Sequence, residues 1–223
     1  MKVKVNIPTE LRDLSVMQYA SYLNMIDQYE AMRDDSKNPD IFYNLKTLEI
    51  FCGINYEDGM RLRVQDVNRI VSNIEKLLLE KPDLITTFTI GDTTFGFIPK
   101  LDDMTFGEYI DLDTNISNWD NMYKAMAVLY RPLEKKDGDK YLIQEYKGDL
   151  YHEAMKHTPL DVAFSSLLFF YHLGIDLSKG MRKYLEEQMT EEDSLRLKTL
   201  EESGVGINRS IRLLGEMLEN MTI

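Results

Sequence analysis

The chain is poor in several residue types, with one cysteine and three histidines among its 223 residues. The single thiol, Cys52, cannot form an internal disulfide, which fits a reducing intracellular environment. No segment holds the roughly 18 uninterrupted apolar residues that a membrane span needs, and the N-terminus lacks the apolar run of a signal peptide. Basic residues are also in deficit, because 26 Lys and Arg stand against 38 Asp and Glu. A net charge of −12 repels phosphate backbones and argues against nucleic-acid binding through a broad face.

Motifs that carry chemistry are missing as well. The chain contains no GxSxG, no P-loop and no dinucleotide fingerprint. His152 and His157 resemble the histidine pair of a zinc protease, but a helix would turn side chains five residues apart to point about 140° away from each other. His172 is expected in the core or at a helix C-terminus, with a catalytic role as the alternative. Cys52 lies in an apolar context and is expected to be inert.

Acidic clusters do not define a site either. The pairs Asp34-Asp35, Asp102-Asp103 and Glu191-Glu192 are placed in loops or first helical turns, where they favour the helix dipole. Asp111-Leu112-Asp113 lacks the further ligands and the glycine of a calcium loop. We therefore predict no catalytic, cofactor-binding or metal-binding residues, no cofactor, and a protein that is not an enzyme.

A short motif that occurs twice is the most informative feature present. Residues 7–19 and 98–109 share Ile-Pro, Leu, Asp, Leu or Met, Ser or Thr, Gln or Glu, and Tyr in one order, with one residue skipped. Each copy carries a capping box, Ser15 with Gln18 and Thr105 with Glu108. Each also has the spacing of a hydrophobic staple, Leu14 with Tyr19 and Met104 with Tyr109.

Strand-like sequence precedes both copies, at Lys2–Ile7 and at Thr94–Ile98. Each copy is thus predicted to be a strand, a proline break, a short loop and a capped helix. Two interpretations stay open: a duplicated assembly module, or two independent helices that are each well capped.

Periodicity along the chain predicts an α+β protein that is predominantly α-helical, with about eight helices and two short β-hairpins. The hairpins are expected at 87–98 and 135–148. The principal helices are expected at about 15–29, 38–53, 65–80, 117–130, 158–174, 181–200 and 208–221. We divide the chain into an N-terminal helical region with a short leading strand, 1–84, and a hairpin plus helical region, 85–223. The two regions can form a single compact domain.

The sequence leaves the roles of two predicted helices open. Phe164–Leu173 is apolar nearly all round, so it is either a central core helix or a helix buried against a partner, and Gly174 is expected to end it. The segment from Asn208 to Met221 is amphipathic and follows a glycine-containing break. It can pack on its own domain, dock on a partner or swap between subunits.

Three stretches together carry a resemblance to a known class of proteins. They are Phe95–Pro99 with Thr105–Leu112, then Lys124–Pro132, then Pro159–Ala163. Their order and surroundings resemble virion-associated proteins of tailed bacteriophages, of the crAss-like phage type, over about residues 60–220. The resemblance implies a structural or cargo role in the tail or head–tail region, and it supplies no catalytic residues.

On this basis we expect a non-enzymatic bacteriophage virion protein, either a tail or head–tail structural component or a packaged cargo protein. It would act through contacts with tail, portal or connector proteins, in many copies, in the virion and in the host cytoplasm during assembly. The expected contact elements are the Phe164–Leu173 helix, the Phe88–Phe97 hairpin and the C-terminal helix. Two alternatives remain: a tail assembly chaperone absent from the mature particle, and a host-directed enzyme or inhibitor.

Overall fold

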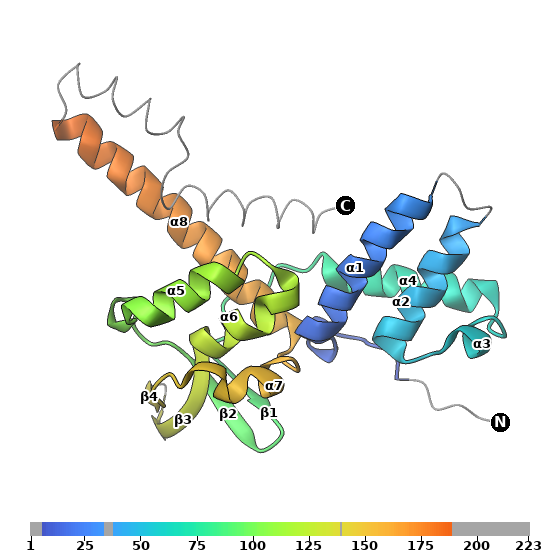
Figure 1. Cartoon of the computed structure of the whole chain (residues 1–223), viewed down its shortest axis with the longest axis horizontal. Coiled ribbons are helices and arrows are strands. Elements are labelled where there is room, and N and C mark those ends of the chain that lie inside the picture. Colours follow the sequence, from blue (N-terminus) through green and yellow to red (C-terminus); the bar gives the residue numbers. More distant parts are fainter. Residues whose placement is uncertain (1–5, 34–37, 139, 189–223) are drawn as a thin grey trace.

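Figure 1 shows a computed structural model of the chain, which describes residues 6–33, 38–138 and 140–188. Within these residues lie eight α-helices and four β-strands. The helices are α1 Val16–Met32, α2 Pro39–Cys52, α3 Tyr56–Gly59, α4 Val64–Leu78, α5 Phe106–Asn115, α6 Met122–Leu129, α7 His152–Met155 and α8 Leu160–Gln188. The strands are β1 Thr87–Ile90, β2 Thr93–Phe97, β3 Tyr130–Asp137 and β4 Lys140–Ile143. The predicted helix-rich α+β class is confirmed.

The four strands form one antiparallel sheet in the order β1-β2-β3-β4. Both predicted hairpins are present, and their turns contain Gly91 at φ 57° and Gly138 at φ 59°. Glycine adopts such positive φ values without steric cost. The hairpins are not separate, because β2 pairs with β3 through Phe95–Phe97 and Tyr130–Pro132. The sheet therefore brings together strands that are separated in sequence by α5 and α6.

Both copies of the repeated motif begin a helix as predicted. Ser15 caps α1 with Gln18 at the third helical position, and Thr105 caps α5 with Glu108 at the same position. Both boxes are complete, because the cap side chain accepts the backbone N–H of the third residue and that residue's side chain accepts the N–H of the cap. Short 3-10 turns that we did not predict precede the caps, at Leu11–Asp13 and Leu101–Asp103.

The two copies differ around these shared helix starts. In the second copy β2 ends directly before the Ile-Pro pair. In the first copy Asn6 and Ile7 are not in a strand, and the rest of the predicted strand lies outside the described residues. Leu14 and Tyr19 are both buried, as a hydrophobic staple requires, whereas Tyr109 is half exposed. The two copies thus share the capping box, but they differ in the preceding strand and in the burial of the staple residues.

Backbone hydrogen bonds join the beginnings of α1 and α8. The Leu160 N–H donates to the Leu14 carbonyl over 2.8 Å, and the Val16 N–H donates to the Thr158 carbonyl over 3.0 Å. Beside them, the Arg12 guanidinium lies 3.2 Å from the Asp161 carboxylate. Two helices that are far apart in sequence therefore start at one place and leave it in different directions (Figure 1).

The hydrophobic core is centred where α6 and the sheet meet the first half of α8. Helix α6 is buried over most of its length, and Tyr130 directly follows it with no exposed surface. The Phe164 ring of α8 packs edge-on against Tyr19 and Trp119, with centroids 5.2 and 5.7 Å apart. Buried residues from both 1–84 and 85–223 belong to this one core.

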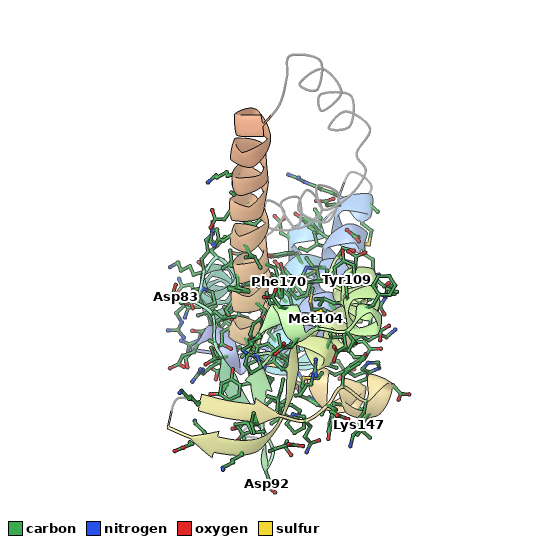
Figure 2. The ribbon with its side chains drawn as sticks, turned by 90° about the vertical axis from the view of Figure 1, so that its left-hand side faces the viewer. Asp83, Asp92, Met104, Tyr109, Lys147 and Phe170 are labelled. Carbon is green, nitrogen blue, oxygen red and sulfur yellow. The ribbon has the colours of Figure 1, made fainter. Side chains whose placement is uncertain are left out.

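Helix α8 is longer than predicted. We expected Gly174 to end it, but the helix continues to Gln188. An interior glycine costs only about 1 kcal/mol relative to alanine, and no proline follows to break the helix. Beyond the core α8 projects from the body of the protein (Figures 1 and 2). The helix expected at 208–221 lies outside the described residues.

The predicted helix at 117–130 also needs correction, because α6 begins only at Met122. The residues before it, Trp119–Asn121, form a separate 3-10 turn. The Asn118 side chain caps this turn by accepting the Asp120 N–H.

A buried hydroxyl joins the start of β3 to helix α8 and to the segment before β1. Tyr130 donates its hydroxyl hydrogen to the Ile85 carbonyl over 2.6 Å, and the same oxygen lies 2.9 Å from the Ser166 hydroxyl. Burial raises the pKa of Tyr130, so the phenol stays protonated and able to donate.

Replacing this hydroxyl, as Tyr130→Phe, is expected to lower the free energy of unfolding by about 1–3 kcal/mol, because the partly buried Ile85 carbonyl loses its donor and the buried Ser166 hydroxyl loses a partner. Urea-induced unfolding measures the change. The matched control is Tyr109→Phe, at a half-exposed tyrosine, which should alter stability by less than about 0.5 kcal/mol. Equal effects of the two substitutions would contradict the assignment.

Candidate functional site

Helix α5 is attached to the sheet through an acidic side chain. Glu108 serves first as the third residue of the capping box, where its Oε2 accepts the Thr105 N–H over 2.6 Å. Its other carboxylate oxygen, Oε1, lies 2.6 Å from Nη2 of Arg131 at the start of β3. The Nη2 contact is short but poorly aligned for a hydrogen bond, so its attraction is mainly ionic. The Glu108 and Arg131 side chains are only 7% and 9% exposed.

Further contacts hold the guanidinium in place. Arg131 donates from Nε to the Val128 carbonyl over 3.3 Å and lies 5.7 Å from the centre of the Tyr146 ring. Tyr146 in turn donates its hydroxyl hydrogen to the Asp111 carboxylate of α5 over 3.0 Å. Burial, with the bonded Asp111 carboxylate, raises the pKa of Tyr146 to about 12. The phenol is therefore a hydrogen-bond donor at neutral pH. Helix α5 is thus held to neighbouring segments at two residues, Glu108 and Asp111.

The opposite face of α5 is apolar and exposed. Phe106 is 78% exposed, and Tyr109 and Ile110 are about half exposed. Positions three and four residues apart share one face of a helix, and Asp113 continues that face one turn further. We call Phe106, Tyr109, Ile110 and Asp113 the α5 face. In Figure 2 the end of the molecule that carries α5 is turned to the viewer, with Tyr109 labelled.

This arrangement inverts the usual amphipathic helix. A surface helix normally buries its apolar side chains and exposes its charges. Here Glu108 and Leu112 face inward while three large apolar side chains face solvent. The inversion is possible because Arg131 compensates the buried carboxylate. Exposed apolar side chains gathered on one rigid helix are typical of a protein-binding surface.

A second exposed apolar cluster surrounds the start of α4. Met60, Leu62 and Val64 are exposed, with Val64 at 74%, and they alternate with the exposed arginines Arg61 and Arg63. We call residues 60–64 the α4 loop. The Arg61 guanidinium lies 3.6 Å from Asp58, a surface ion pair that contributes little to stability. This loop thus combines apolar side chains with positive charge on a strongly acidic protein.

The residues weighed as metal ligands or catalysts lie apart. His152 begins α7, its ring 5.8 Å from Tyr123, and its Nε2 is buried without a hydrogen-bond partner. His157 follows after the end of α7 and is exposed. His172 lies in the interior of α8 and is also exposed, so it is neither in the core nor at a helix C-terminus as expected. Across the described part of the chain, no three His, Cys, Asp or Glu side chains are grouped so that they could hold a metal ion.

The other candidates also have structural surroundings. Cys52 is buried at the end of α2, and burial raises the pKa of its thiol to about 11. Asp111 is bonded to Tyr146, and Asp113 lies on the α5 face one turn beyond Tyr109 and Ile110. Asp102 and Asp103 form part of the 3-10 turn before α5 and are exposed.

Two expected contact elements lie partly in the core. Phe164 and Leu167 of α8 are buried, and so are Phe95 and Phe97 of the β1–β2 hairpin, so these side chains do not form an external surface in the folded protein. Phe169 and Phe170 of α8 and Phe88 of the hairpin are half-buried. The third expected element, the C-terminal helix, lies outside the described residues. Sequence reasoning missed the α5 face, because the helical spacing of Phe106, Tyr109 and Ile110 by itself predicts a buried apolar stripe.

Comparisons with known proteins complete the description of the site. Neither a protein family nor a curated protein nor a solved structure matches the chain. Among the described helices, none has the length and apolar character needed to cross a bilayer.

Truncating Glu108→Ala is expected to lower the free energy of unfolding by about 3–5 kcal/mol, because Arg131 is then left charged and buried without its partner. Urea unfolding again gives the value. Replacing both partners, as Glu108→Gln with Arg131→Met, should recover most of the loss, since neither charge remains buried. Additive losses in the double variant would show that the two side chains act independently.

The Cys52 thiol should resist modification in the folded protein. With a pKa of about 11, only about one thiol in a thousand is ionised at pH 8, and the side chain is buried. A chromogenic thiol reagent should therefore react at least about 100-fold more slowly than in urea, with the rate rising as pH increases towards 11. Equal rates in folded and unfolded protein would contradict the burial of Cys52.

Proposed function

We propose that this chain is a non-enzymatic component of a tailed-phage particle, structural or packaged, that works through protein–protein contacts. The resemblance described above motivates the phage setting. The first two of its three stretches meet in space: Phe95–Pro99 contains the end of β2, Thr105–Leu112 covers most of α5, and Lys124–Pro132 runs from α6 into β3, which pairs with β2. These are the elements that the Glu108–Arg131 pair holds together. The third stretch, Pro159–Ala163, lies at the start of α8.

The exposed α5 face is the observation that carries the proposal. It presents Phe106, Tyr109 and Ile110 on a helix whose other side is fixed by a buried ion pair. A surface held rigid before binding loses little conformational entropy on contact. Tail, portal or connector proteins are the proposed partners, and the net charge of −12 keeps the protein away from packaged nucleic acid.

Mass spectrometry of gradient-purified particles tests the proposal. The expected result is that peptides of this chain persist through salt washes in a constant ratio to the major structural proteins. A phage carrying Phe106→Ser should incorporate markedly less of the protein, because the face loses its most exposed apolar side chain. The matched control, Leu142→Ser at an exposed leucine of β4, should incorporate normally.

Complete absence of the chain from purified particles would overturn the virion assignment. If the protein then associated with tail components only in infected cells, it would be an assembly chaperone. Association with a host protein alone would indicate a host-directed role.

A further inference from the structure

The α5 face combines apolar side chains with negative charge. Asp113 lies on the face itself, and the exposed Asp102 and Asp103 lie just before the helix. A protein partner that covers Phe106 would bring its own charges close to these carboxylates. Complementary binding therefore requires apolar side chains accompanied by lysine or arginine.

The α4 loop has this chemistry. Its three exposed apolar residues alternate with Arg61 and Arg63 over only five positions. Figure 1 places α5 and α3, which directly precedes the loop, toward opposite ends of the molecule. The α4 loop of one copy therefore cannot contact the α5 face of the same copy. In a pair of copies, the α4 loop of one can pack against the α5 face of the other.

We infer that this protein associates with itself head to tail, through the α5 face of one copy and the α4 loop of another. A symmetric contact between two α5 faces is disfavoured, because it would bring Asp102, Asp103 and Asp113 of both copies together. A head-to-tail contact leaves one unpaired surface at each end of a pair. Further copies can therefore add at these free surfaces and form a closed ring or an open filament.

This inference shares with the proposed function only the use of α5 for protein contact, and it does not depend on the phage setting. Self-association is measured with the purified full chain, whereas virion membership is measured on particles. Failure of one test leaves the other result standing.

Charge reversal with mixing tests the inference. Sedimentation velocity at low salt, from roughly 10 µM to roughly 1 mM, covers the range of weak interfaces. Wild-type protein should form species larger than a monomer as concentration rises. Arg61→Glu with Arg63→Glu should weaken self-association about tenfold or more, and so should Asp102→Lys with Asp103→Lys. Mixing the two variants should restore association, because each then meets opposite charge in the other.

Uncharged variants separate the surfaces from general charge effects. Phe106→Ser and Val64→Ser should each weaken association about tenfold, whereas Leu142→Ser should leave it unchanged. Circular dichroism confirms that each variant is folded. A monomer at every concentration would overturn the inference. So would association that depends on Phe106 but not on the arginines, which would indicate a symmetric α5 contact, or failure of the mixed variants to associate.

Discussion

The buried ion pair between Glu108 and Arg131 determines how helix α5 is presented. Pairs of this kind often add little net stability, because desolvation of the two charges offsets their attraction. Their effect is on orientation. With Glu108 fixed inward against β3, the 100° turn per residue places Phe106, Tyr109 and Ile110 on the solvent side. The same residue completes the capping box with Thr105, so one carboxylate both starts the helix and sets its rotation.

A helix that exposes an apolar face in this way suits a protein that binds other proteins. Phe106 and Val64 are more exposed than any other large apolar side chain in the described residues, and they lie on two separate surfaces of opposite charge. One surface is bordered by aspartates and the other is interleaved with arginines. The complementarity provides a route to many copies in one assembly without a symmetric dimer.

Features that depend on neighbouring residues could be predicted from the sequence. Ser15 and Thr105 cap their helices, and Gly91 and Gly138 form their hairpin turns, because capping and turn geometry are local. Features that depend on distant residues could not. The pairing of β2 with β3 and the joining of Leu14 to Leu160 have no signal in hydrophobic periodicity. Sequence pattern alone would bury the α5 face and expose Glu108, since only the folded structure brings Arg131 to that carboxylate.

Hydrogen exchange on the full chain, measured at low and high protein concentration, shows whether the α5 face of one copy binds the α4 loop of another. Backbone amides of α5 and of residues 60–64 should become slower to exchange together as concentration rises, while those of the β3–β4 hairpin should not change. Exchange that does not depend on concentration in either segment would contradict this contact, and so would protection of α5 alone.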